Sequence, residues 1–384
     1  AVNNGTIALE IGTIENSNKN IAIANKDGIA KNAGKIQITD KTAEELKGTD
    51  FSSLFTGNYI NSGMLVDRDG IAIEKKNDVE VGGDNVTSDT INNAGKENEG
   101  SSIVIKDDTT ITASNDPIEV DSLNVTGTVT IANGTEGNKP VEIKGATTNL
   151  DAKGSLAIGN GDVKADLKIT GGTVNGTKDK EAVTFAATES TLTLAGTTFS
   201  GNIGTGTETG KLITEGTDAT VITGDVKANK LELAGTTAIT GNIETTSMAV
   251  TTGETRIDGE ITGAKTITIG NDLETASFAL KAADTPSSVP ENATVTYSAN
   301  SAIIGIGAST SSTPKLFANS ISDENSTGTT ITIEANGMLQ AEVDNTGKYV
   351  FSNSNDVTVK GDGKVQLLTS NINKKTLELK KVGI

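Results

Sequence analysis

The residues of this chain that could do chemistry are mainly carboxylates, because its 384 residues include 50 Asp and Glu but no His and no Cys. Catalytic triads, thiol nucleophiles and zinc sites of the usual ligands need one of the two missing residue types. Paired carboxylates could still serve a glycosidase or a lyase. No acidic cluster stands beside aromatic residues in the strand-like segments, however. The sequence therefore predicts a protein that is not an enzyme, with no catalytic residues, no cofactor and no metal site.

Two short motifs resemble ligand-binding loops but fail on spacing. GTGTETGKL (204–212) has Thr205 where a phosphate-binding loop needs its first Gly, and Leu212 follows the Lys in place of Ser or Thr. VDRDG (66–70) resembles a calcium loop, but Leu65 and Lys76 occupy the first and twelfth ligand positions. We interpret both motifs as turns.

Three aromatic residues form the strongest candidate for a recognition site. Phe51, Phe55 and Tyr59 are spaced four apart in the segment 41–65, in a chain with only 7 Phe, 3 Tyr and no Trp. Exposed rings at such spacing can act as hot spots of a binding surface. They can equally pack the segment onto the rest of the fold or cover an open end. Both interpretations stay open, and we name the three residues as candidate ligand- or receptor-binding residues.

The elements that must position these residues are short strands. Apolar residues alternate with polar ones in many short runs, which indicates strands with one face buried. Gly, Asn or Asp usually follows, and these residues favour turns. The alternating pairs are Ile21/Ile23, Ile36/Ile38, Ile71/Ile73, Val79/Val81, Ile103/Ile105, Leu123/Val125, Val129/Ile131, Val141/Ile143, Leu156/Ile158, Leu167/Ile169, Leu192/Leu194, Leu231/Leu233, Met248/Val250, Ile267/Ile269 and Ile331/Ile333.

One repeated sequence segment indicates how the strands are arranged. LTLAGTTFSGNI (192–203) is closely similar to LELAGTTAITGNI (231–243), and strand starts between 123 and 269 lie mostly 17 to 20 residues apart, with some shorter and longer steps. Such spacing is typical of a solenoid whose small units share one core. We expect the two Leu-x-Leu pairs to occupy the same core column two coils apart, with Gly196 and Gly235 turning the same corner at positive φ.

The predicted fold is therefore an all-β solenoid over residues 1–384, with insertions. A β-propeller would need repeats of about 40 to 50 residues and usually aromatic markers. Helix signals are nearly absent except in 41–65, where Thr42 can cap a helical turn with Glu45 at its third position. This segment is expected to leave the coil, and 88–101 and 281–293 are expected to be long loops.

The charge of the chain excludes one class of partner. The formal net charge is −18 and the pI is about 4.5. Nucleic-acid binding is not expected, because an acidic surface repels phosphate backbones. No apolar run is long enough to span a membrane. The chain begins Ala1-Val2-Asn3-Asn4 and ends within a strand-like run, so we expect it to be a piece of a longer protein.

Taken together, these features resemble the passenger region of a type V autotransporter adhesin. The resemblance rests on richness in Gly, Asn and Thr, on the absence of Cys, and on strings such as INSGMLVDRDGIAIEKKNDV (60–79) and INNAGKENEGSSIVI (91–105). The richness in Asn and Lys is most similar to that of the large fusobacterial outer-membrane adhesins. The family implies a right-handed parallel β-helix, exported through a C-terminal outer-membrane barrel that is missing from this sequence. It shares a scaffold and not a site motif, so the resemblance assigns no functional residue.

The function expected on these grounds is adhesion without catalysis. The chain would be an extracellular segment at a bacterial cell surface, held at the outer membrane through the missing part of its parent. Its partner would be a host cell-surface receptor or glycan, or the surface of another bacterium. Two alternatives remain: a carbohydrate-active β-helix enzyme (polysaccharide lyase or hydrolase), and a passive stalk that presents a distal binding tip.

Overall fold

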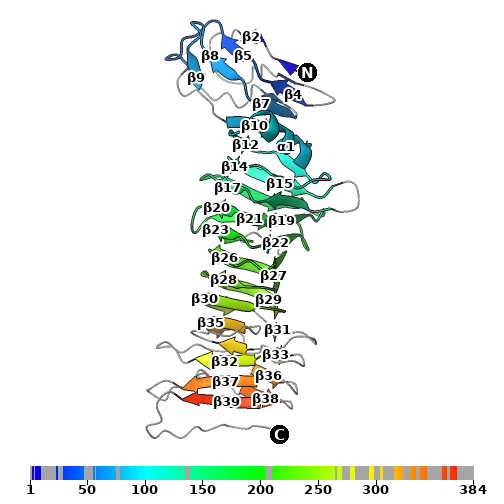
Figure 1. Ribbon diagram of the computed structural model, residues 1–384, viewed down its shortest axis with the longest axis vertical. Coiled ribbons are helices and arrows are strands. Elements are labelled where there is room, and N and C mark those ends of the chain that lie inside the picture. The colour runs from blue at the N-terminus through cyan, green and yellow to red at the C-terminus, as the bar shows by residue number, and fades with distance from the viewer. Residues whose placement is uncertain are drawn as a thin grey trace.

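A computed structural model shows an elongated stack of short strands, with β2 (Thr6–Leu9) near one end and β39 (Lys364–Thr369) near the other (Figure 1). The structure describes residues 5–9, 29–46, 58–74, 78–134, 139–204 and 210–263, and elsewhere only the backbone pairing of short strands. Nearly all strand pairs are parallel, which confirms an all-β, solenoid-like fold. The described part of the chain contains no helix long and apolar enough to cross a membrane.

Three parallel ladders build the central body, because most strands there pair with the strand three positions later. The first ladder contains β10 (Asp78–Gly82), β12 (Ser102–Ile105), β14 (Ser122–Val125), β17 (Thr147–Leu150), β20 (Thr173–Asn175), β23 (Thr198–Ser200), β26 (Thr220–Thr223), β28 (Thr237–Ile239) and β30 (Glu254–Thr262). The second contains β11 (Val86–Thr87), β13 (Thr110–Thr112), β15 (Thr128–Ala132), β18 (Ser155–Ile158), β21 (Glu181–Phe185), β24 (Asn202–Ile203) and the start of β27 (Val226–Leu233). The third contains β16 (Val141–Lys144), β19 (Asp166–Thr170), β22 (Thr191–Ala195), β25 (Lys211–Glu215), the end of β27 and the end of β29 (Ile243–Val250). The start of β29 continues the second ladder.

The ladders continue towards the C-terminus as backbone pairings. Strands β31 (Thr266–Ile269), β33 (Thr294–Tyr297), β36 (Thr329–Ile333) and β38 (Val357–Lys360) extend the third ladder. Strand β35 (Lys315–Ser322) pairs with β30 and with β34 (Ile303–Gly305), while β32 (Ser277–Lys281), β37 (Met338–Val343) and β39 (Lys364–Thr369) form a separate parallel sheet. The long loop predicted at 281–293 lies, apart from Lys281 at the end of β32, outside the described residues.

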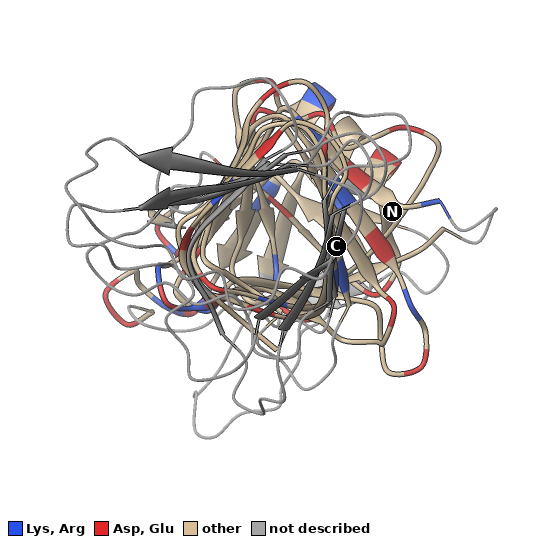
Figure 2. Ribbon diagram, turned by 90° about the horizontal axis from the view of Figure 1, so that it is seen from below, with Lys and Arg blue, Asp and Glu red and all other residues tan. Residues whose placement is uncertain are grey.

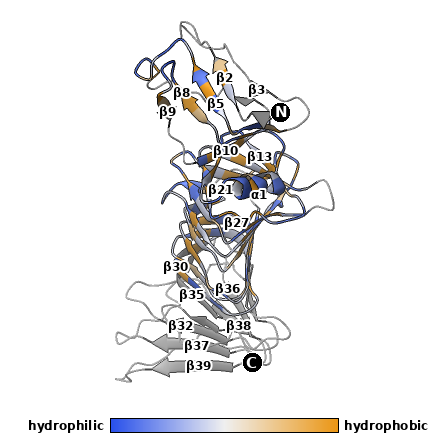
Figure 3. Ribbon diagram, turned by 45° about the horizontal axis from the view of Figure 1, so that its top comes forward, coloured by the Kyte–Doolittle hydropathy of each residue, from blue (hydrophilic) through white to orange (hydrophobic). Residues whose placement is uncertain are grey.

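The inner positions of the ladders form columns of aliphatic side chains. Hydrophobic and hydrophilic residues alternate along the described strands (Figure 3). Leu192 pairs with Leu212 and Leu212 with Leu231, and all three side chains are buried in one cluster. Gly196 has φ +61° and Gly235 has φ +72°. The predictions from the repeated sequence are therefore confirmed: the two Leu-x-Leu pairs share one core column two coils apart, and the glycines that follow them turn at positive φ.

The coils are less regular than the sequence suggested. In the first ladder, the step from Ile222 to its partner Ile239 is 17 residues, whereas the step from Thr148 to Val174 is 26. The longer coils hold their extra residues in the turns between ladders. Because only the strands must stack, the turns can vary without disturbing the core.

Helix α1 (Ser88–Glu97) corrects the prediction of a loop at 88–101. Thr87 caps the helix, and Ile91 and Ala94 are buried in the core cluster. The Asn92 amide donates to Pro117 O (2.7 Å) and accepts from Glu119 N (2.8 Å). Pro117 and Glu119 flank Ile118, whose backbone bridges to Ile143 of β16. The helix therefore lies where the third ladder would otherwise begin, and one side chain makes the two hydrogen bonds that a neighbouring strand would supply.

The N-terminal coils join the central body through an antiparallel seam. In these coils β4 (Ala30–Asn32) pairs with β7 (Tyr59–Asn61) and with β1 (Val2–Asn3), and β5 (Lys35–Ile38) pairs with β8 (Met64–Val66) and β2 (Thr6–Leu9). Strand β3 (Ile23–Ala24) pairs with β6 (Phe55–Thr56). All these pairs are parallel, but β7 pairs with β10 in antiparallel register, after an antiparallel hairpin of β8 with β9 (Ala72–Glu74).

Two local predictions change in this region. The segment 41–65 is expected to leave the coil, but its end is part of the coil: residues 59–61 and 64–65 belong to the paired strands β7 and β8. Residues 43–46 form a single turn, closed by Leu46 N and Thr42 O (3.1 Å) and capped by Thr42 and Glu45 as expected. Ile71, expected to be buried beside Ile73, has 58% of its surface exposed because it lies in the turn of the β8–β9 hairpin.

Candidate functional site

The structure does not gather the three predicted aromatic residues into one described surface. Phe51 lies outside the described residues, and Phe55 is described only by the backbone of β6. Tyr59 lies on β7 with 6% of its surface exposed. Its ring lies against Gly82 of β10, where an added Cβ would be 2.8 Å from Tyr59 Cε1. Burial, and then the nearby Glu80 carboxylate, raise the pKa of the Tyr59 hydroxyl above its ordinary value. Tyr59 therefore packs the seam between the two sets of coils.

A chain of buried polar side chains crosses the same seam. Asn32 Nδ2 donates to Asn61 Oδ1 (2.8 Å), and Asn61 Nδ2 donates to Glu80 Oε2 (3.4 Å). Lys106 Nζ lies 3.6 Å from Glu80 Oε1. Buried polar groups are costly without partners. We interpret this series of contacts as structural: it fixes the pairing of the strands across the seam.

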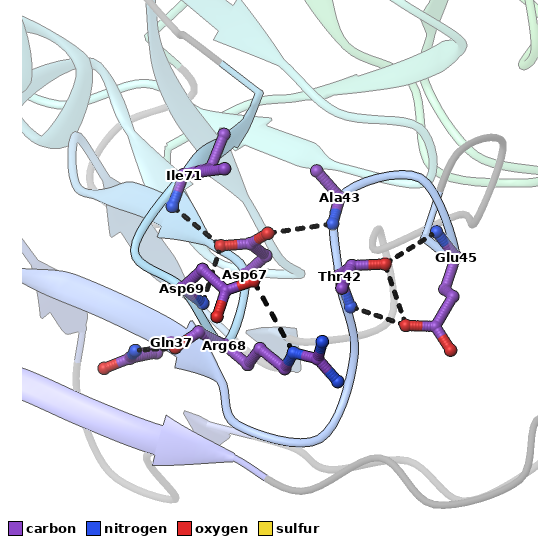
Figure 4. A network of polar contacts seen from close by, with 8 residues as sticks. All are labelled: Gln37, Thr42, Ala43, Glu45, Asp67, Arg68, Asp69 and Ile71. Carbon is purple, nitrogen blue, oxygen red and sulfur yellow. Dashed lines mark hydrogen bonds and ion pairs between the residues drawn. The ribbon is translucent and has the colours of Figure 1, made fainter.

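Asp67 organises the turns of the N-terminal coils (Figure 4). Its carboxylate accepts hydrogen bonds from the backbone N–H of Ala43 (2.9 Å), Asp69 (2.9 Å) and Ile71 (2.7 Å), and only 1% of the residue is exposed. Burial raises the pKa of Asp67, but these N–H donors outweigh it and hold the pKa below its ordinary value. The carboxylate is thus engaged by donors, which confirms VDRDG as a turn.

The charged side chains of the third ladder pair with one another, both between coils and along one strand. Lys168 and Glu215 are 2.9 Å apart, and Glu232 lies 2.6 Å from Lys211 and 2.8 Å from Lys230. Viewed along the axis, charged residues are distributed around the periphery of the coil (Figure 2). Among the residues that the structure describes, no group of three or more acidic side chains is placed to hold a metal ion.

The outer side of the first ladder differs from the third ladder in carrying no charged residues from β14 to β28. From β14 to β28 its outward positions form two columns across six consecutive coils, and every one of them is partly or fully exposed. Their residues are small, and none is charged. We call this set the uncharged face: Ser122, Asn124, Thr147, Asn149, Thr173, Asn175, Thr198, Ser200, Val221, Thr223, Ala238 and Thr240.

Hydrogen bonds between coils hold one column of the uncharged face in place. Asn149 Nδ2 donates to Asn124 Oδ1 (2.8 Å), and Asn175 Nδ2 donates to Asn149 Oδ1 (2.9 Å). An amide carries two N–H groups and an oxygen with two lone pairs. Each Asn of this ladder therefore keeps donor or acceptor capacity that a ligand could use.

The other column is a row of threonines. Thr147, Thr173 and Thr198 are direct partners on three consecutive coils. Their β-branched side chains have few χ1 rotamers on a strand, so the hydroxyls are largely fixed. Fixed side chains lose little conformational entropy when they bind a partner.

The sequence analysis missed this face because its residues are ordinary strand and turn residues when taken singly. The signal that could have found it is the repeated pattern Thr-x-Asn at Thr147/Asn149 and Thr173/Asn175, followed by Thr198/Ser200. Variable coil lengths hide the register between these copies. The chain matches no family model, and no curated protein and no solved structure is significantly similar to it.

Proposed function

We propose that this chain is a non-catalytic, extracellular segment of a bacterial surface adhesin, wound as a right-handed parallel β-helix. The parallel pairing of the strands supports this winding, because connections between parallel strands of one sheet are usually right-handed. The observation that carries the function is the uncharged face. It presents one column that is polar along six coils and a second that is polar along the first four, in a chain whose net charge is −18.

A long array of this kind suits attachment. Each hydroxyl or amide contributes a modest hydrogen bond, since net gains are about 0.5–1.5 kcal/mol per bond. Many such contacts to one extended partner, or to repeated groups on a cell surface, add up through effective concentration. The proposed partner is a host cell-surface receptor or glycan, or the surface of another bacterium.

The test compares two triple variants with the same change in charge. The first carries Thr147→Glu, Thr173→Glu and Thr198→Glu on the uncharged face. The control carries Thr191→Glu, Thr193→Glu and Ser247→Glu at half-exposed positions of the third ladder. Binding of the labelled proteins to host cells and to bacteria is measured by flow cytometry, and circular dichroism checks that each variant folds.

We expect the first variant to lose binding and the control to retain it. Equal binding by all three proteins would reject the uncharged face as the contact surface. Failure of the unmodified chain to bind any cell would favour the passive stalk. Release of reducing ends from a polysaccharide panel would favour the enzyme.

A further inference from the structure

We infer that the uncharged face binds a neutral, extended polysaccharide whose chain runs parallel to the long axis of the protein. This inference rests on the proposed function and names the chemical class of the partner. It is carried by the charge, the hydrogen-bonding groups and the periodicity of the face.

The distribution of charge selects a neutral partner. Charged residues lie beyond both ends of the uncharged face. On one side β12 adds the uncharged Ser102 and Val104 before Asp78 and the buried Glu80 on β10, and on the other side Arg256 and Asp258 lie on β30, next to β28. Between β10 and β30, the outward positions of the first ladder hold no charged residue. A chain of net charge −18 repels anionic polysaccharides, and the face itself offers a cationic partner no carboxylate.

The hydrogen-bonding groups match a hydroxyl-rich partner. Sugar hydroxyls both donate and accept hydrogen bonds, as do the hydroxyls of Ser and Thr and the amides of Asn. The bonds from Asn149 to Asn124 and from Asn175 to Asn149 hold these amides in fixed orientations. An apolar partner would bury these polar groups without giving them hydrogen-bond partners, which is unfavourable.

The periodicity suits a polymer that lies along the axis. Adjacent strands of a sheet are about 4.8 Å apart, which is close to the rise per residue of an extended β-linked glucan. Five steps from β14 to β28 therefore span about 24 Å, enough for one sugar to face each coil. Val221 and Ala238 continue the threonine column with aliphatic side chains, which the C–H groups of a sugar ring can contact.

The experiment is affinity electrophoresis of the whole chain in gels that contain one polysaccharide each. The neutral probes are hydroxyethylcellulose, a soluble β-1,3-glucan and dextran, and the anionic probes are alginate and hyaluronan. We expect retardation by at least one neutral β-linked glucan and none by the anionic probes. Retardation by the anionic probes alone, or by no probe, overturns the inference.

Two matched variants locate the contact. Asn149→Asp introduces a charge at the centre of the amide ladder with almost no change in shape, and Thr173→Val removes one hydroxyl while keeping the branched side chain. We expect a loss of affinity of about tenfold for Asn149→Asp and less for Thr173→Val. Thr193→Val, on the third ladder, is the control and should bind as the unmodified chain does. Equal affinity in all four proteins overturns the inference.

The results separate the inference from the proposed function. If cells bind through the uncharged face but no neutral polysaccharide is retained, the inference is wrong and the adhesin proposal stands. If a neutral polysaccharide is retained through another surface, the variants Asn149→Asp and Thr173→Val bind normally and the inference is again wrong. If neither cells nor polysaccharides bind, both proposals fail.

Discussion

Leu192 and Leu231 occupy one column of the core, two coils apart, with Leu212 between them in direct register. The two copies of Leu-x-Leu-Ala-Gly-Thr-Thr are therefore equivalent in space as well as in sequence. Gly196 and Gly235 follow them and turn at positive φ. Each coil buries its aliphatic residues against the coils on either side, so the stability of one coil depends on its neighbours.

Truncation of the middle member of this column should destabilise the stack. Leu212 is fully buried, and Leu212→Ala removes contacts with both adjacent coils. We expect a loss of about 2–5 kcal/mol in the free energy of unfolding, as for other buried leucines. Urea unfolding followed by circular dichroism measures the change. Thr193→Ala, half-exposed on β22, should change stability by less than about 0.5 kcal/mol; an equal effect of both changes would contradict a shared core.

Gly241, at a corner of the coil, should tolerate no side chain. A Cβ added to Gly241 would collide with the carbonyl oxygen of Gly224, one coil earlier, so Gly241→Ala must push two coils apart. Gly145 also lies in a turn, with φ +70°, but an added Cβ meets nothing there. Gly145→Ala should therefore cost only about 1 kcal/mol of backbone strain. Thermal unfolding of both variants checks the order, and a smaller effect at Gly241 would contradict the close stacking of the corners.

The parts of the fold that follow from local spacing could be predicted from the sequence. Alternating pairs such as Ile103/Ile105, Leu167/Ile169 and Leu192/Leu194 are buried as expected, because a strand with one covered face has period two. The corner at Gly235 could also be predicted, because the residue type reflects the backbone conformation.

Helix α1 could not be predicted in the same way. Its sequence SDTINNAGKE contains Thr, Asn and Gly, which have poor helix propensity. The helix forms because Ile91 and Ala94 are buried in the core and because Thr87 and Thr90 make a capping box without Glu. The burial depends on packing against β10, β11 and β12, which helix propensity does not describe, and the cap uses Thr in place of the usual Glu.

The uncharged face is hidden from the sequence for a different reason. Its members lie at intervals that change from coil to coil, from 26 residues between Asn149 and Asn175 to 25 between Asn175 and Ser200 and 23 between Ser200 and Thr223. No fixed period connects them. Only the register of the strands shows that they form columns.

The turns around Asp67 should loosen in acid. The folded-state pKa of Asp67 is lower than its ordinary value, so the carboxylate contributes stability above the unfolded pKa of about 3.9 and loses it as pH falls through the lower folded value. Hydrogen exchange should show protection of the Ala43, Asp69 and Ile71 amides at pH 6 that decreases towards pH 3. Asp67→Asn should reduce this protection at pH 6 and weaken its dependence on pH. Unchanged protection in the variant would show that Asp67 does not hold the turns.

The side chain of Asn92 should anchor helix α1 to the first coil of the third ladder. Asn92→Ala leaves Pro117 O and Glu119 N without their side-chain partner, and an unmade buried hydrogen bond costs about 1–3 kcal/mol. We expect lower stability towards urea and faster hydrogen exchange at Glu119. Asn93 is exposed on the same helix, so Asn93→Ala should be neutral or slightly stabilising because Ala favours the helix. If both changes had the same small effect, the amide of Asn92 would not be acting in place of a strand, and the buried residues Ile91 and Ala94 alone would fix the helix.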